Sequence, residues 1–386
     1  MNLKLSNRHE WVIQSEIRNM SIECGRIGGI NLSQGVCDLE VPELVRMGAK
    51  SAIDKGINSY TRYDGIDELR AAIAKKHKVF TGRDVNPETE IVVSAGATGA
   101  LYCACLALLN PGDEAIVFEP YYGYHISTLI ATQAVPVYVR MNPPKWMFSK
   151  EDLEAVVTER TKGIIVCTPS NPSGKVFSRE ELDMIAGFAE RYNLFVFTDE
   201  IYEHFVYDGR EHISPVTLPG MRDRTITISG LSKTFSITGW RIGYSICDAK
   251  WSQAIGYFND LVYVCAPAPL QMGVARGLKE LKPGYYQKIS EEYRGKRNMI
   301  CDALNKAGLK PYIPQGAYYV LADISGLPGE SCKERAMYLL HKTGIACVPG
   351  EAFYHDDSGE GLARFCFAKD NAVLDKACQK LEELRT

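Results

Sequence analysis

The sequence predicts an α/β protein with a large domain, in which a mostly parallel seven-stranded sheet lies between helices, and a smaller α+β domain. The 386 residues exceed the usual size of a single domain. In the middle of the chain, short β-branched and aromatic runs alternate with longer amphipathic ones, as parallel strands joined by helices do. After about Pro283 this alternation stops, which indicates a second unit.

Seven apolar runs are short enough to be strands of the large domain. In chain order they are Ile91–Ser94, Glu114–Phe118, Val135–Val139, Gly163–Cys167, Leu194–Thr198, Thr225–Ser229 and Gly243–Cys247. Between two of them, residues 179–192 place Leu182, Ile185, Ala186 and Ala189 on one face, as an amphipathic helix would. Parallel strands with right-handed crossovers put their ligand site at the carboxyl ends of the strands. The residues that follow each strand are therefore the first candidates for a site.

The C-terminal part predicts the smaller domain. A long polar run, Tyr285–Asn305, predicts a helix that leads the chain out of the large sheet. Two hydrophobic runs, Ala317–Asp323 and Ala363–Phe367, predict strands, with a helix at Cys332–Thr343 between them. We therefore expect a small domain over residues 285–386, an N-terminal segment of residues 1–40 that joins it, and a large domain over residues 41–284.

Composition and charge narrow the class of protein. The chain is 46% hydrophobic and 24% charged, as expected of a soluble enzyme, and its net charge of −3 provides no bulk attraction for nucleic acid or an anionic membrane. No run reaches the roughly 20 apolar residues of a membrane span, and the N-terminus lacks the apolar core of a signal peptide. The 12 cysteines are scattered without Cys-x-x-Cys spacing, which predicts free thiols, no metal and a cytoplasmic location.

The most informative segment is Ser229–Arg241, in which Lys233 lies among small and hydroxyl-bearing residues. A lysine that forms a Schiff base with pyridoxal 5'-phosphate needs room at its tip and a partly unprotonated amine. It also needs hydroxyls and a cation for the phosphate. Small and hydroxyl-bearing residues next to Lys233 provide the room and the hydroxyls, and Arg241, eight positions later, provides the cation. The segment suggests this cofactor, although a lysine in such a turn can also be an ordinary loop residue.

Two further strand ends carry polar residues suited to a pyridine ring. Asp199 follows one strand, where its carboxylate could pair with a protonated ring nitrogen, and Tyr202 could hydrogen-bond the ring's phenolic oxygen. Asn171 follows the preceding strand and presents its amide at the same edge. Each also has an ordinary alternative, as a helix cap, a packing residue or a turn residue.

A glycine-rich turn, Gly96–Ala100, opens an apolar helix at Leu101–Leu109, so its N–H groups and the helix dipole could hold a phosphate. The turn matches neither a P-loop nor the dinucleotide fingerprint, which argues against a nicotinamide-dependent oxidoreductase. Tyr122 could stack on a flat cofactor. Arg241 suits the phosphate, and Arg364, in an apolar strand, suits a fork-to-fork pair with a substrate carboxylate or with an internal acid.

Taken together and in this order, the segments resemble the class I aminotransferases, the aspartate aminotransferase-like enzymes of the fold-type I pyridoxal-phosphate superfamily. The similarity extends from Ile30–Gly35 through Asn58–Gly65 to Val348–Gly350. The resemblance implies that Lys233 carries the cofactor and acts as general acid and base, and that Asp199 pairs with the pyridine nitrogen. The other implied contacts are Tyr202 and Asn171 on the phenolic oxygen, Tyr122 on the ring, Gly96, Ala97, Thr98, Ser232 and Arg241 around the phosphate, and Arg364, Asn171 and the backbone of Gly35 on the substrate's α-carboxylate.

The resemblance also implies a homodimer with the active site at its interface, where Tyr60 reaches the partner subunit's phosphate. Three positions depart from the family pattern. The hydroxyl residue that many relatives carry three positions before the lysine is Gly230 here, with Ser229 one earlier, and the usual stacking tryptophan is Tyr122. The second arginine, which binds a side-chain carboxylate in the aspartate enzymes, has no clear match; the local polar alternatives are Arg18, Arg62 and His125.

The implied reaction moves an amino group in two half-reactions between an L-amino acid and a 2-oxo acid such as 2-oxoglutarate. The fold does not specify the amino acid, so aromatic, methionine- or glutamine-like and aspartate side chains all stay open. A broad pocket is favoured by the side chains of Trp11, Ile13, Tyr63, Tyr122 and Tyr124.

Two alternatives share the motifs. One is a carbon–sulfur lyase of the same fold, which would release ammonia and pyruvate without an amino acceptor. The other is a non-catalytic, aminotransferase-like ligand sensor. The lack of a helix-turn-helix segment and of a basic face argues against the sensor.

Overall fold

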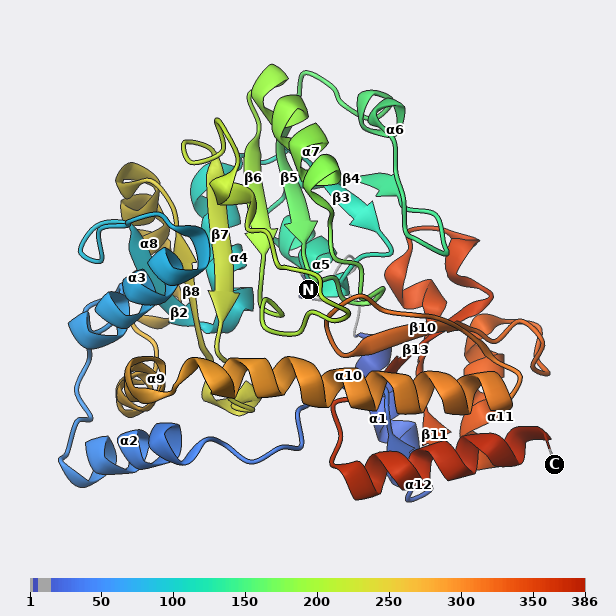
Figure 1. Cartoon of the computed structure of the whole chain (residues 1–386). Coiled ribbons are helices and arrows are strands. Elements are labelled where there is room, and N and C mark those ends of the chain that lie inside the picture. Colours follow the sequence, from blue (N-terminus) through green and yellow to red (C-terminus); the bar gives the residue numbers. More distant parts are fainter. Residues whose placement is uncertain (1–2, 6–14, 386) are drawn as a thin grey trace.

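The seven predicted strands form one sheet. The computed structural model describes residues 3–5 and 15–385, and its largest sheet has the strand order β2-β8-β7-β6-β5-β3-β4 (Figure 1). The strands are β2 Ile91–Ala95, β3 Glu114–Glu119, β4 Val135–Arg140, β5 Thr161–Cys167, β6 Phe195–Asp199, β7 Thr225–Gly230 and β8 Ile242–Ile246. Strand β8 is antiparallel to both of its neighbours, β2 and β7, and the other pairings in this sheet are parallel. The mostly parallel arrangement is therefore confirmed.

Helices cover both faces of this sheet because successive side chains of a strand point to opposite sides. In β3, Ile116 and Phe118 pack in one cluster with α7 (Arg179–Arg191), whereas Ala115 and Val117 pack with α4 (Gly96–Leu108), α5 (Gly123–Ala131) and α8 (Ala249–Tyr263). A third cluster at the β2 and β8 edge includes α2 (Glu43–Asp54), α3 (Asp67–Thr81) and α9 (Ala268–Glu280). The apolar face predicted for α7 is buried.

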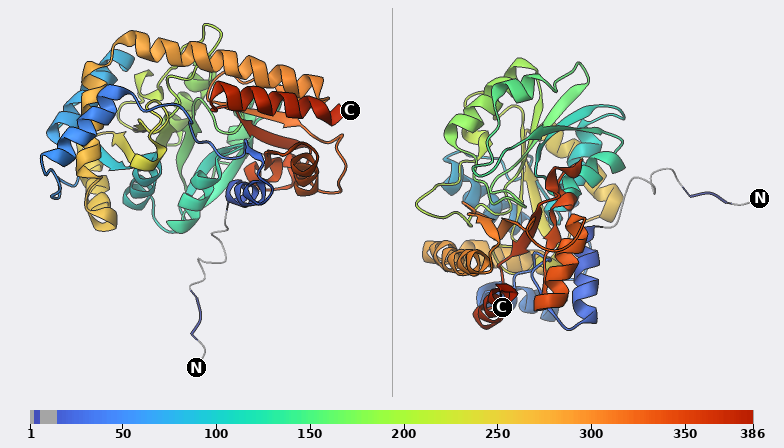
Figure 2. Two further views of the ribbon diagram at one scale, coloured as in Figure 1. Left: turned by 90° about the horizontal axis from the view of Figure 1, so that it is seen from below. Right: turned by 90° about the vertical axis from the view of Figure 1, so that its right-hand side faces the viewer.

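A second, smaller sheet lies below the large one in Figure 1. Its order is β12-β13-β10-β9 and its pairings are antiparallel, with β9 Lys310–Tyr312, β10 Tyr319–Asp323, β12 Val348–Pro349 and β13 Leu362–Cys366. The long helix α10 (Pro283–Lys306) reaches this region and packs against α12 (Asn371–Glu382), as Figure 2 shows. Helix α11 spans Cys332–Thr343, as the sequence predicts.

The N-terminal segment packs with the C-terminal elements. Strand β1 (Ile30–Asn31) pairs in parallel with β11 (Ile345–Ala346), and Met20 and Cys24 of α1 (Glu16–Arg26) share a core cluster with α10, α11 and α12. These contacts support the proposed division at residues 1–40, 41–284 and 285–386, which stays a prediction.

One predicted boundary was wrong. Helix α4 begins at Gly96 rather than at Leu101, so the glycine-rich turn forms its first turn. Small residues allow the start of this helix to approach β8 closely, since a Cβ added to Gly243 would lie 2.3 Å from the Ala97 nitrogen.

Within the described ranges, no helix is both long and apolar enough to span a bilayer. All 12 cysteines are free in this part of the chain, and most are buried.

Candidate active site

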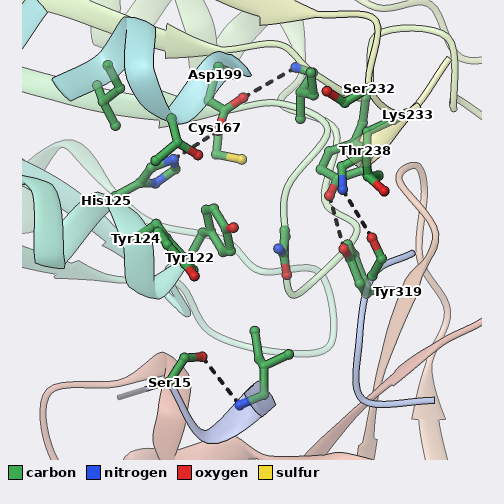
Figure 3. Close-up of a pocket in the computed structure, with 18 of the residues that line it drawn as sticks. Ser15, Tyr122, Tyr124, His125, Cys167, Asp199, Ser232, Lys233, Thr238 and Tyr319 are labelled. Atoms are coloured by element: carbon green, nitrogen blue, oxygen red, sulfur yellow. Dashed lines mark hydrogen bonds and ion pairs between the residues drawn. The ribbon is translucent and has the colours of Figure 1, made fainter. Parts of the chain in front are cut away.

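A cavity of about 820 Å³ opens at the carboxyl ends of the parallel strands. This size suits a cofactor together with a small substrate. Figure 3 shows His125 and Asp199 on one side of the cavity and Ser232, Lys233, Thr238 and Tyr319 on the other. The predicted residues that line it are Gly35, Ala97, Thr98, Tyr122, Asn171, Asp199, Tyr202, Ser232, Lys233, Arg241 and Arg364.

Strand direction explains why residues so far apart in sequence meet here. Asp199 is the last residue of β6, and Ser232 and Lys233 follow the end of β7. Because β8 is antiparallel, its first residue lies at the same edge, and Arg241 immediately precedes it. The sheet therefore brings an acid, an amine and a guanidinium to one edge.

Lys233 extends into the cavity, where its Nζ donates a hydrogen bond to the Gly35 carbonyl at 3.1 Å. Burial lowers the pKa of the Lys233 amine, and the positive charges of Arg241 and Arg364 lower it further. A larger fraction of neutral amine makes this lysine a better nucleophile and base than an exposed one.

Asp199 is held by a buried histidine. Its Oδ2 lies 2.9 Å from His125 Nε2, and its Oδ1 accepts a hydrogen bond from the Ile201 amide at 3.3 Å. Nearby, the Tyr202 and Tyr319 hydroxyls are 3.0 Å apart. Burial raises the pKa of Tyr202 well above its usual value, and the neighbouring Tyr319 raises it further. The Tyr202 hydroxyl therefore keeps its proton and can donate a hydrogen bond.

One end of the cavity is suited to an anion. Arg241 has left-handed backbone geometry (φ 56°) and donates to the carbonyls of Thr238 and Ala95 at 2.8 and 3.3 Å. The buried Ser232 Oγ has no hydrogen-bond partner among the described residues. Gly96 lies behind this end with φ 78°, and a Cβ there would be 2.2 Å from Arg241 Nη2. Glycine at this position therefore leaves room for the guanidinium.

Arg364 lines the same cavity. Its side chain is almost fully buried between the rings of Tyr319 and Phe353, at 4.3 and 5.1 Å from their centroids. Nη1 donates to Asn171 Oδ1 at 2.7 Å and Nη2 donates to the Ser33 carbonyl at 2.6 Å. Nε has no partner among the residues that the structure describes. A buried guanidinium without a carboxylate partner is suited to bind one from a ligand.

Comparison with known proteins agrees with this geometry. The family model "Aminotransferase class I and II" matches residues 27–381. The chain belongs to this family. A kynurenine–oxoglutarate transaminase of Dictyostelium discoideum is 35% identical, with 93% of this chain and 92% of that protein covered. An aromatic-amino-acid aminotransferase of Thermococcus litoralis is 33% identical, with 99% and 98% covered.

Among solved structures, N-succinyldiaminopimelate aminotransferase from Mycobacterium tuberculosis superposes with a TM-score of 0.95 at 33% identity, covering 99% of this chain and all of that chain. The predicted fold type and family are therefore confirmed. This aminotransferase transfers an amino group between an amino acid and a 2-oxo acid.

Some of the predicted site residues do not line the cavity of this aminotransferase. Gly96 lies behind it, and Tyr60 is 83% exposed and does not line it. Tyr122 and Tyr124 line the cavity, with rings stacked at 5.3 Å, whereas Tyr63 packs 6.0 Å from Tyr257 and is absent from the lining. Trp11 and Ile13 fall outside the described residues. Of the five side chains expected to form a broad pocket, the structure therefore places Tyr122 and Tyr124 at the cavity.

The structure explains why the aminotransferase carries Gly230 three positions before the lysine. A Cβ there would lie 2.9 Å from the Ile242 carbonyl oxygen and 3.0 Å from Gly243 Cα, because β7 and β8 are close at this point. Ser229 does not replace the missing hydroxyl, since its Oγ lies 3.3 Å from Glu203 Oε1 and outside the cavity. Ser232 and Thr238 are therefore the hydroxyl-bearing residues of this segment that line the cavity.

One residue of the cavity was missed, and one of the three local polar alternatives has another contact. His125, named with Arg18 and Arg62 as an alternative for the second arginine, contacts Asp199. Tyr319 belongs to a strand that the sequence marks only as hydrophobic, yet it contacts both Tyr202 and Arg364. The alternating pattern of that strand places Tyr319 and Leu321 on one face, but sequence alone does not reveal that this face meets the cavity.

Proposed function

We propose that this aminotransferase binds pyridoxal 5'-phosphate through Lys233 and uses it to exchange amino groups between an L-amino acid and 2-oxoglutarate. The observation that carries the proposal is that Lys233, a half-buried amine with a lowered pKa, lines one cavity together with Ser232, Arg241 and Asp199. The sequence-predicted residues fit the cofactor because buried polar atoms there lack partners among the described residues, namely Ser232 Oγ beside Arg241 and Nε of Arg364.

Each end of the cofactor would meet a matching group. Arg241, Ser232, Thr98 and the first turn of α4 would hold the phosphate, since helix N-terminal amides and a guanidinium both favour an anion. Asp199, held by His125, would face the pyridine nitrogen. Tyr122 would stack on the ring, and Tyr202 with Asn171 would donate to the phenolic oxygen.

When bound, pyridoxal phosphate supplies an electron sink for the pair left behind when the α-proton of the amino acid departs. Lys233, as a neutral amine, takes that proton and returns it. Arg364 and Asn171 hold the substrate's α-carboxylate, which fixes the α-carbon near Lys233. Asp199 keeps a negative charge where a protonated pyridine nitrogen needs one.

The amino donor is the least constrained part of the proposal. Tyr122 and Tyr124 give the cavity an aromatic wall, and relatives are named for kynurenine and for aromatic amino acids. We therefore propose a donor with an aromatic or methionine- or glutamine-like side chain, or aspartate.

We also propose that the enzyme works as a homodimer in the cytoplasm. The side chain of Tyr60 is exposed. Three residues later, the ring of Tyr63 contacts Tyr257 of α8. The C-terminal part of α8 and the residue after it expose further apolar side chains, Leu261, Val262 and Val264. An exposed apolar patch of this kind is typical of a protein interface, and Tyr60 would reach the partner subunit's phosphate from it. Light scattering should therefore give twice the chain mass.

The proposed reaction is tested by incubating the purified protein with pyridoxal phosphate, single amino acids and 2-oxoglutarate. We expect glutamate to form at a rate that depends on the amino acid supplied. Ammonia and pyruvate released from cystathionine without an oxo acid, in the absence of glutamate formation, would instead establish the lyase alternative. No turnover in either assay would support the ligand-sensor alternative.

A further inference from the structure

The cavity carries more positive charge than the cofactor and an α-carboxylate require. Among the described residues that line it, the cations are Arg18, Lys233, Arg241 and Arg364, and Asp199 is the acid. Under the proposed function, Lys233 bonds to the cofactor, Arg241 meets the phosphate and Arg364 meets the α-carboxylate. Arg18 then remains without an assigned anion.

Arg18 has no partner within the part of the chain that the structure describes. It lies in the first turn of α1 and is exposed, and its guanidinium makes no hydrogen bond or ion pair there. The acids of the same helix are engaged elsewhere, Glu16 with Asn19 and Lys333, and Glu23 with Arg26. A guanidinium that lines a cavity without a protein carboxylate is free to bind a ligand's carboxylate.

The other two residues considered for this role are occupied. Arg62 pairs with Asp64 at 2.7 Å and with Glu88 at 2.9 Å, and it does not line the cavity. His125 is 2.9 Å from Asp199. Arg18 is therefore the remaining member of the three that can meet a second carboxylate.

Arg18 also lies next to the site of the first carboxylate. Arg364 donates to the carbonyl of Ser33, and the Ser33 hydroxyl lies 3.4 Å from the carbonyl oxygen of Ile17. Arg18 is the next residue, so one serine separates its backbone from the guanidinium of Arg364. Figure 3 shows Ser15, at the start of this segment, across the cavity from Asp199 with Tyr122 between them.

We propose that Arg18 binds the distal carboxylate of a dicarboxylic substrate, the 2-oxoglutarate and glutamate pair. Arg364 would hold the α-carboxylate of such a molecule while Arg18 forms a fork-to-fork pair with the other. Amino donors with apolar side chains would lie against Tyr122, Tyr124 and Ile22 without using Arg18. The inference rests on the proposed function, because it identifies the substrate class of that same site.

The test compares two acceptors with one amino donor held constant and pyridoxal phosphate present. 2-Oxoglutarate has a distal carboxylate, and 2-oxohexanoate has a neutral chain of similar length. For Arg18→Gln we expect the KM for 2-oxoglutarate to rise about tenfold or more, with kcat nearly unchanged, because one charge-assisted pair is lost. The KM for 2-oxohexanoate should stay the same or fall. Arg18→Lys should recover part of the loss.

Arg26→Gln is the matched control, since it removes the same charge from the exposed end of the same helix outside the cavity. It should leave both KM values unchanged. Added salt should raise the parent enzyme's KM for 2-oxoglutarate and not for 2-oxohexanoate, because exposed ion pairs are screened.

Equal changes for both acceptors in Arg18→Gln, or no change for either, would overturn the inference. So would a parent enzyme that uses 2-oxohexanoate but not 2-oxoglutarate, although amino transfer itself would then stand. A parent enzyme that uses neither acceptor with any donor would refute the proposed function as well.

Discussion

Single buried polar residues determine what the cavity can bind. Arg364 illustrates this, because its guanidinium is fixed by Asn171 and Ser33 and by two aromatic rings before any ligand arrives. A group held in this way loses little freedom on binding, and a planar guanidinium matches a carboxylate in geometry as well as in charge.

Replacing Arg364 with lysine should weaken binding of every substrate. A lysine ammonium keeps the charge but cannot reach Asn171, the Ser33 carbonyl and a carboxylate in one plane. We expect the KM of both amino acid and oxo acid to rise about tenfold to a hundredfold. Steady-state kinetics with 2-oxoglutarate and with 2-oxohexanoate would measure this.

The exposed pair of Arg276 with Glu280 supplies a control, and Arg276→Lys should change neither constant. A selective effect of Arg364→Lys on the dicarboxylic acceptor alone would place Arg364 at the distal carboxylate and contradict the assignment.

Most residues around the cavity could be predicted from the sequence because most of them follow a strand, and parallel strands end at one edge; Arg241, which precedes β8, and Arg364, within β13, are exceptions. The contacts between these residues could not be predicted from the sequence in the same way. Arg364 meets Ser33 across 331 positions, and His125 meets Asp199 across 74. Such pairs depend on how elements pack, which local propensity and periodicity do not encode.

At the level of elements, the junction of β8 with the start of α4 fixes the part of the cavity that we propose for the phosphate. A Cβ on Gly243 would lie 2.3 Å from both the Ala97 nitrogen and the carbonyl carbon of Gly96. These are backbone atoms, so the strand or the helix must move to make room. The seven strands themselves were predictable because their apolar runs are short and separated by amphipathic helices.

Gly243→Ala should therefore destabilise the fold and loosen the cofactor. We expect the free energy of unfolding to fall by about 1–3 kcal/mol, the usual cost of overpacking. Urea unfolding would measure the loss, and dialysis would show weaker retention of pyridoxal phosphate.

Gly187→Ala is a suitable comparison because no atom lies within 4 Å of the added Cβ in the middle of α7. That variant should gain about 0.5–1 kcal/mol. Equal stability of Gly243→Ala and the parent would show that the junction tolerates displacement.

At the level of the whole molecule, α10 connects the regions of the two sheets, and an ion pair fixes it to the segment that follows β6. Arg297 of α10 makes two contacts with Asp208, at 2.5 and 3.0 Å. Hydrogen bonds from Arg297 lower the pKa of the Asp208 carboxyl below its usual 3.8. The division into domains remains a prediction, and this pair crosses its proposed boundary.

A carboxyl whose pKa is lowered by folding stabilises the fold above its unfolded pKa, and the gain disappears as the pH falls through the folded pKa. Asp208→Asn should therefore cost up to about 1 kcal/mol near pH 6, because the Asp208 carboxylate is half exposed although Arg297 is buried, and less near pH 3. Asparagine tolerates the positive φ of 60° at this position. Urea midpoints at the two pH values would measure the difference.

The exposed pair of Arg179 with Asp183 within α7 offers a comparison, and Asp183→Asn should change stability by only a few tenths of a kcal/mol. A constant cost of Asp208→Asn at both pH values would show that packing, and not charge, explains the contact.

The proposed chemistry depends most on Lys233, the residue proposed to carry the cofactor. The decisive measurement is the visible absorbance of the purified protein with pyridoxal phosphate, before and after an amino acid and then 2-oxoglutarate are added. We expect the band of cofactor bound covalently to a lysine, its loss with a suitable amino acid, its return with the oxo acid, and no such band in Lys233→Ala. No band in the parent, or the same band in Lys233→Ala, would contradict the central claim.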